Sequence, residues 1–108
     1  MCVSLKSLET LFIYGNSLTG VIPESIGKLT SMRKFDIHQN GISGTIPDSI
    51  GSMTAINTLS LFGNELEGPI PDISNLQELK ILDIHNSNIG DSLPIGIFTL
   101  PNLGKHEW

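Results

Sequence analysis

Two copies of Asp-Ile-His are the stretches of this sequence best suited to chemistry. They are Asp36-Ile37-His38 and Asp83-Ile84-His85. Alternate side chains of a β-strand share one face, so each carboxylate would lie beside its imidazole while the isoleucine points the other way. Carboxylate and imidazole groups are common ligands of zinc. Whether the two pairs can act on one ion depends on the elements that carry them.

Other candidates for catalysis are weak. Cys2 is the only cysteine, with no base at a recognisable spacing, and we interpret it as a small buried hydrophobic residue. Three carboxylates follow a proline, where the first turn of a helix favours negative charge: Glu24, Asp48 and Asp72. No glycine-rich phosphate loop is present beyond the repeated turns. The sequence therefore predicts a protein that is not an enzyme and holds no cofactor.

The elements that carry these residues recur about every 24 residues. Successive rounds begin at Leu5, Leu29, Met53 and Leu76, and the third round is one residue short. Asn and Gly-x-Ile-Pro recur at fixed offsets within the rounds, which chance spacing of leucines would not produce. We predict one domain over 1–108, with repeats at about 5–28, 29–52, 53–75 and 76–99 and a partial repeat at 100–108. This last repeat loses the pattern at His106.

Each round contains L-x-L-x-x-N, whose alternation predicts a short strand with one buried face. One such strand cannot bury that face alone, so the rounds should stack as parallel strands about 4.8 Å apart. The inward residues of adjacent strands would then be Ile13, Ile37, Leu61 and Ile84. At the strand exits we expect side chains that satisfy loop amides and carbonyls. These are Asn16, Asn40 and Asn64, with Ser87 a weaker substitute.

The second half of each round predicts a turn. Glycines that permit unusual backbone angles precede Ile-Pro at Gly20, Gly44 and Gly68. The residue before proline favours extended geometry, and a short helical turn should follow. Each turn should bury one isoleucine, namely Ile26, Ile50 or Ile97. Gly27 and Gly51 fit the end of such a turn.

The stretch LETLFIYGNSLTGVIPESIGKL resembles the plant-type leucine-rich repeat, with pattern LxxLxxLxLxxNxLxGxIPxxLGxL, and the resemblance covers about residues 5–103. It implies an α/β solenoid: a right-handed superhelix with a parallel β-sheet on the concave face and short 3₁₀ or irregular turns on the convex face. The family mostly serves extracellular recognition in receptor-like kinases, receptor-like proteins and polygalacturonase-inhibiting proteins. An extracellular or cell-surface location is thus implied. No signal peptide or membrane-spanning segment can be read, so a cytoplasmic location stays open.

In such a stack the outward residues of the strands form a grid on the concave face. Exposed aromatic residues there are not needed by the fold and are favoured at binding patches. The predicted partner-binding residues are Phe12, Tyr14, Lys34, Asp36, His38, Ser60, Phe62, Asp83 and His85. The two Asp-His pairs would lie about 10 Å apart. Zinc ligands must converge to about 2.0–2.3 Å from the ion, so we expect no metal site.

Charge and hydropathy limit the classes of partner that this chain could bind. A formal charge of −5 repels phosphate backbones, which argues against nucleic acid. No apolar run reaches the roughly 18 residues of a membrane span. A protein or peptide is the expected partner, and a glycan stays open. The favoured function is non-catalytic recognition, as in receptor-like signalling or defence ectodomains. The alternatives are a structural spacer within a longer array and an inhibitor of a secreted glycoside hydrolase.

Overall fold

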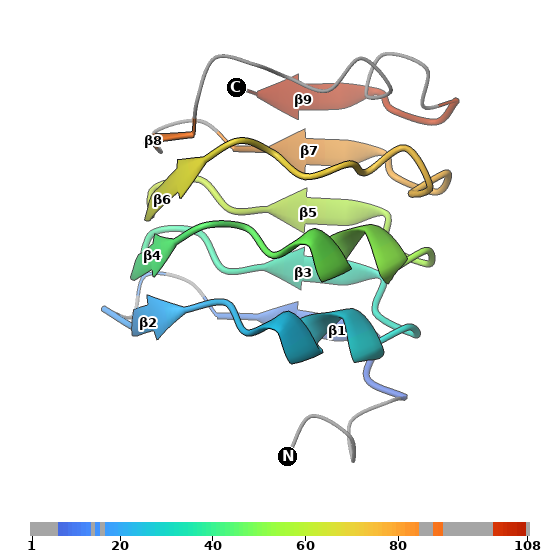
Figure 1. Ribbon diagram of the computed structural model, residues 1–108. Helices are drawn as coiled ribbons and strands as arrows, with labels where there is room; N and C mark the ends of the chain where they lie inside the picture. Colours follow the sequence, from blue (N-terminus) through green and yellow to red (C-terminus); the bar gives the residue numbers. More distant parts are fainter. Residues whose placement is uncertain (1–6, 14, 16, 85–87, 90–100, 108) are drawn as a thin grey trace.

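The chain forms two parallel β-sheets that face each other across one core (Figure 1). The computed structural model describes residues 7–13, 15, 17–84, 88–89 and 101–107. The larger sheet has the order β1 (Thr10–Phe12), β3 (Lys34–Asp36), β5 (Thr58–Ser60), β7 (Ile81–Asp83) and β9 (Lys105–Glu107). The smaller has the order β2 (Thr19–Val21), β4 (Gly41–Gly44), β6 (Glu65–Gly68) and β8 (Asn88–Ile89). The chain alternates between the sheets: each of the first four repeats contributes one strand to each sheet, and the described part of the fifth adds β9 to the larger one.

The register of the larger sheet pairs equivalent residues of successive repeats. Leu11 pairs with Phe35, Phe35 with Leu59, and Leu59 with Leu82. The ladder continues one residue further, because the amides of Ile13, Ile37 and Leu61 donate to the next repeat at 2.9, 3.0 and 2.8 Å. The side chains of Ile37, Leu61 and Ile84 are buried, while Ile13 is half-buried in β1's repeat at the edge of the sheet. The predicted stack of parallel, inward-facing strands is confirmed.

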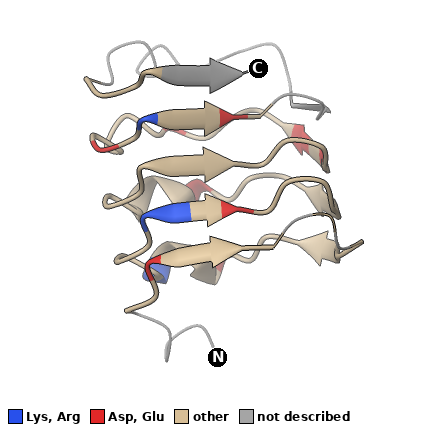
Figure 2. Cartoon of the chain, turned by 180° about the vertical axis from the view of Figure 1, so that it is seen from behind, with Lys and Arg blue, Asp and Glu red and all other residues tan. Residues whose placement is uncertain are grey.

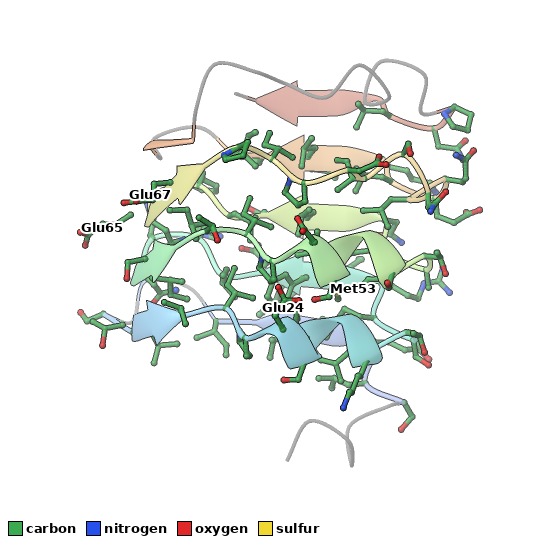
Figure 3. The ribbon with its side chains drawn as sticks, in the orientation of Figure 1. Glu24, Met53, Glu65 and Glu67 are labelled. Atoms are coloured by element: carbon green, nitrogen blue, oxygen red, sulfur yellow. The ribbon has the colours of Figure 1, made fainter. Side chains whose placement is uncertain are left out.

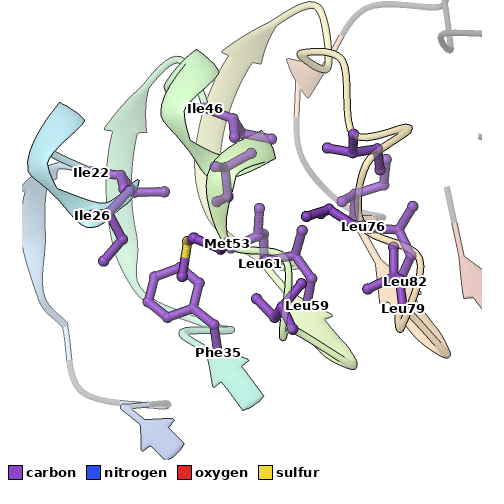
Figure 4. Packing of buried hydrophobic residues seen from close by; sticks show 14 of the residues in the cluster. Ile22, Ile26, Phe35, Ile46, Met53, Leu59, Leu61, Leu76, Leu79 and Leu82 are labelled. Carbon is purple, nitrogen blue, oxygen red and sulfur yellow. The ribbon is translucent and has the colours of Figure 1, made fainter. Parts of the chain in front are cut away.

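One hydrophobic core runs through the stack (Figure 4). Its fully buried side chains come from the second, third and fourth repeats: Met32, Ile50, Met53, Ile56, Leu61, Leu66, Ile73, Leu76, Leu79 and Leu82. Burying one such aliphatic side chain contributes about 1.5–3 kcal/mol. Because each repeat packs against its neighbours, the core fixes the register and so holds the outward residues in columns.

Buried asparagines join neighbouring repeats, as the sequence predicts. The Asn64 amide nitrogen donates to the carbonyls of Ile37 at 2.9 Å and Leu61 at 3.1 Å, and its oxygen accepts from the Ile42 amide at 3.2 Å. Asn40 repeats this arrangement one repeat earlier, donating to Ile13 and accepting from Leu18. Asn16 and Ser87, the other predicted members, lie outside the described residues.

The second sheet goes beyond the sequence-based expectation, which foresaw only an extended segment before each proline. Here β2, β4, β6 and β8 pair in parallel. Gly44 and Gly68 end β4 and β6 with φ of +80° and +84°, which side chains other than glycine rarely adopt. These glycines let the chain leave the second sheet and turn towards the convex side.

Short 3₁₀ helices follow the prolines in two repeats. The helices η2 (Glu24–Lys28) and η3 (Asp48–Ser52) start after an extended proline and bury Ile26 and Ile50, as predicted. The third repeat forms only turns over the corresponding described residues, where it is one residue shorter. Here the Asp72 carboxylate accepts from the Ser74 amide at 3.0 Å. Ile97 lies outside the described residues.

Gly27 and Gly51 serve a different purpose from the one predicted. Both lie inside the 3₁₀ helices and not at their ends. A Cβ at Gly51 would lie 2.6 Å from the Asp72 carbonyl oxygen, and one at Gly27 would lie 2.6 Å from atoms of Ser49. Close packing between repeats therefore explains these glycines.

The fifth repeat, predicted to be partial, still contributes a strand to the larger sheet. The pattern of apolar residues is lost at His106, yet β9 pairs in parallel with β7 and places His106 opposite Leu82. Backbone hydrogen bonds do not depend on side-chain type, so the edge of the sheet accepts a strand that lacks the leucine. The sheet thus extends one strand beyond the last complete repeat.

Candidate recognition surface

The candidate surface is the outer, concave face of the larger sheet, seen in Figure 2. The middle residue of each strand points into the core, so the first and third residues point outwards. Pairing aligns the first residues in one column, Thr10, Lys34, Thr58 and Ile81, and the third residues in another, Phe12, Asp36, Ser60 and Asp83. The columns are those expected from the sequence.

An ordered cluster of three side chains lies at the C-terminal ends of β3 and β5. The His38 imidazole stacks on the Phe62 ring of the next repeat, with centroids 4.5 Å apart and planes 7° apart. The Asp36 carboxylate contacts His38 Nδ1 and also accepts from the His38 backbone amide at 3.2 Å. The imidazole is thus held by a carboxylate and by a ring. Such fixation lowers the entropy that a partner must remove on binding.

Exposure differs among the predicted contact residues. Phe12 is 55% exposed and Lys34 is also exposed, while Asp36, His38, Phe62 and Asp83 are partly exposed. Ser60 is only 6% exposed, so it lies below Asp36 and Asp83 and has little surface that a partner could contact. Tyr14 and His85 lie outside the described residues.

The paired Asp36 and His38 do not extend into a larger ligand set. No group of three or more His, Cys, Asp or Glu side chains suited to a metal gathers within the described parts of the chain. Cys2 falls outside those parts. The pair is best understood as a hydrogen-bonded unit of the face.

The residue just before each strand was missed by the sequence reasoning. Arg33, Asn57 and Lys80 hold this position in three successive repeats: the Arg33 carbonyl accepts from the Asn57 and Thr58 amides, and the Asn57 carbonyl accepts from Lys80 and Ile81. A hollow of about 230 Å³ at this edge is lined by Arg33, Ala55, Asn57, Glu78 and Lys80. We call it the strand-start hollow. Its signal in the sequence is a polar residue directly before β1, β3, β5 and β7, namely Glu9, Arg33, Asn57 and Lys80.

Charge is distributed unequally over the molecule. Basic residues lie at the start of β3 and just before β7, and acidic residues lie at the ends of the same strands (Figure 2). On the other side, Glu65 and Glu67 extend from β6 and Glu24 lies on η2 (Figure 3). The larger sheet thus carries both charges across its strands; on the opposite side β6 is acidic, while η2 carries the basic Lys28 as well as Glu24.

Comparison with known proteins agrees with this architecture. The Leucine rich repeat family profile matches residues 6–66, more than half of the chain. The chain belongs to the leucine-rich repeat family. Sequence comparison with curated proteins finds no significant match.

Solved structures of receptor ectodomains resemble this leucine-rich repeat chain closely. The ectodomain of the receptor kinase SOBIR1 from Arabidopsis thaliana has a TM-score of 0.93 at 26% identity, with 99% of this chain covered. PEPR1 with AtPEP1 gives 0.94 at 30% identity over 97% of this chain. The Arabidopsis receptor kinase HAESA, in complex with the peptide hormone IDA and the co-receptor SERK1, gives 0.89 at 34% identity over 94%.

These relatives are longer proteins. The leucine-rich repeat chain spans 58% of the SOBIR1 ectodomain, 15% of the PEPR1 chain and 17% of the HAESA chain. The match therefore concerns the repeats themselves and the plant-type subclass. Where the structure describes this chain, it contains no helix long and apolar enough to cross a bilayer.

Proposed function

We propose that this chain is a non-catalytic recognition module whose concave sheet face binds a protein or peptide. We also propose that it works outside the cell, as part of a receptor-like or defence ectodomain. The observation that carries the proposal is the His38–Phe62 stack, fixed by Asp36 on the outer face of the sheet. We define the sheet face as Phe12, Lys34, Asp36, His38, Phe62 and Asp83.

The fold does not require this arrangement of side chains. The core lies on the other side of the strands, where Phe35, Leu59 and Leu82 are buried. The sheet face instead offers an exposed ring at Phe12, an ordered pair of rings, and charges of both signs. Aromatic anchors surrounded by polar groups are typical of protein interfaces. The similar HAESA structure contains the peptide hormone IDA, and another similar structure is the plant peptide hormone receptor RGFR1 in complex with RGF2, which supports a peptide as the partner here.

Peptide selection tests the proposal directly. A phage library of random peptides would be selected for binding to the immobilised chain. The affinity of the best binder would then be measured by calorimetry. Phe12→Ser and Phe62→Ser should each weaken binding by about tenfold or more, because buried aromatic anchors dominate interface energies. Val21→Ser is the matched control, since Val21 is 63% exposed but lies on the second sheet.

The control should bind like the parent chain. If the two phenylalanine variants also bind like the parent, the sheet face is not the binding surface. If selection yields no binder at all, the structural-spacer alternative is favoured. Thermal unfolding of each variant separates lost contact from lost fold, which matters most for the partly buried Phe62.

A further inference from the structure

We infer that the strand-start hollow is a carboxylate-binding subsite, in which Arg33, Asn57 and Lys80 take an acidic side chain of the bound peptide. The inference rests on the proposed function for its biological ligand. The hollow itself is a separate feature, at the edge of the sheet and not on the sheet face. Of its lining residues, none belongs to the contact set expected from the sequence.

The repeat places the three polar residues in a row. Arg33, Asn57 and Lys80 are joined through consecutive backbone hydrogen bonds of 2.7–3.0 Å at the starts of β3, β5 and β7. Strands are about 4.8 Å apart, so Arg33 and Lys80 flank Asn57 at roughly 10 Å from each other. Both basic side chains are exposed and long enough to reach a group held between them. A carboxylate above Asn57 would lie within reach of both.

The amide of Asn57 is suited to donate. The Thr58 hydroxyl donates to Asn57 Oδ1 at 3.0 Å, which orients the amide and leaves its nitrogen to donate to a ligand. The Arg33 guanidinium offers a planar fork of donors that matches a carboxylate. The Lys80 ammonium adds a point charge. Together the three side chains can supply several hydrogen-bond donors to a carboxylate.

The net charge of the residues that line the hollow favours a ligand with one carboxylate over a more highly charged anion. Arg33 and Lys80 contribute two positive charges and Glu78 one negative charge, so the hollow carries a net charge of +1 in a chain of −5. Neither basic side chain forms an ion pair with another described residue. One carboxylate would neutralise the hollow. A phosphate, with a charge near −2 at neutral pH, would exceed it and meet Glu78.

The hollow adjoins the sheet face. Arg33 directly precedes Lys34, and Asn57 directly precedes Thr58 in the first outward column. The Asp36 column begins three residues after Arg33, or about 10 Å along the strand. A short peptide can therefore place an acidic residue in the hollow and a basic residue beside Asp36, where Figure 2 shows the opposite charge.

The test uses the 108-residue chain and three probes, followed by backbone amide NMR shifts. The probes are acetyl-Gly-Glu-Gly-amide, acetyl-Gly-Gln-Gly-amide and inorganic phosphate. The glutamate peptide should produce saturable shifts at Asn57, Thr58 and Lys80, and the glutamine peptide none. The double variant Arg33→Gln/Lys80→Gln should weaken the glutamate peptide by about tenfold or more. Lys28→Gln, which removes a charge on η2, should change nothing.

Three results would overturn the inference: equal shifts from both peptides, unchanged affinity in the double variant, or tighter binding of phosphate than of the glutamate peptide. None of them depends on the sheet face. Conversely, an unchanged affinity of the selected peptide in Phe12→Ser and Phe62→Ser would overturn the proposed function while the tripeptide result stands. The two failures are therefore distinguishable.

Discussion

Replacing Asn64 by alanine tests how the stack is held together. The Asn64 side chain is 5% exposed and joins the backbones of two repeats. Alanine would remove its donations to the Ile37 and Leu61 carbonyls, at 2.9 and 3.1 Å, and the bond accepted from the Ile42 amide at 3.2 Å. Water has poor access to this position, so it could not fully replace the hydrogen bonds that these backbone carbonyls and this amide make with Asn64.

The expected cost follows from these three hydrogen bonds. At about 1 kcal/mol net for each, Asn64→Ala should lower the free energy of unfolding by about 3 kcal/mol. That is a large share of the roughly 5–15 kcal/mol that stabilises a typical domain. With a urea dependence of roughly 1.5 kcal/mol per molar, the unfolding midpoint should fall by about 2 M.

Urea unfolding followed by circular dichroism measures this effect. Asn75→Ala is the matched control, because Asn75 is exposed and no hydrogen bond joins its side chain to another described residue. The control should change the free energy of unfolding by less than about 0.5 kcal/mol. If the two variants unfold at the same urea concentration, the buried asparagines do not hold the repeats together.

Two further predictions concern the convex turns. Gly51→Ala should cost about 1–3 kcal/mol in thermal unfolding, since its Cβ would lie 2.6 Å from the Asp72 carbonyl oxygen. Gly104→Ala is the control, because its Cβ would meet no heavy atom within 4 Å, and it should leave the stability unchanged. Equal losses of stability in the two variants would show that close packing does not explain Gly51. Hydrogen bonds from the Ser74 hydroxyl and then its backbone amide lower the pKa of Asp72 below 3.8. Its carboxylate should therefore stabilise the fold above that pH and lose this effect as the pH falls through the lowered pKa. Urea curves of the parent and Asp72→Asn should differ at neutral pH and converge in acid, and a constant difference would contradict this.

The larger sheet could be predicted because a strict period constrains register. A one-residue slip would move Phe35, Leu59 and Leu82 from the core to the solvent, so the apolar pattern leaves one solution. The second sheet was harder to predict. Its strands are short, and β2 is exposed throughout, so no alternation of buried residues marks it. Its pairing follows from the stacking of the first sheet.

Details of the site depend on side-chain packing between repeats. The sequence predicts that Asp36, His38 and Phe62 share one face, but the stacking of the two rings depends on their side-chain rotamers, which only the three-dimensional structure gives. Ser60 was expected to contact a partner, yet it is buried between the larger residues of its column. Arg33 and Lys80 directly precede β3 and β7, so the alternating pattern that marks the sheet face does not include them. Their hollow arises where three repeats meet, which no single repeat reveals.

The most direct measurement is the footprint of a selected peptide on the chain, mapped by backbone amide NMR shifts. The largest shifts should fall on the sheet face and its strands, at residues 34–38, 58–62 and 81–83, and the amides of η2 and η3 should not shift. Shifts confined to η2 and η3, or to β2, β4 and β6, would contradict recognition by the concave face.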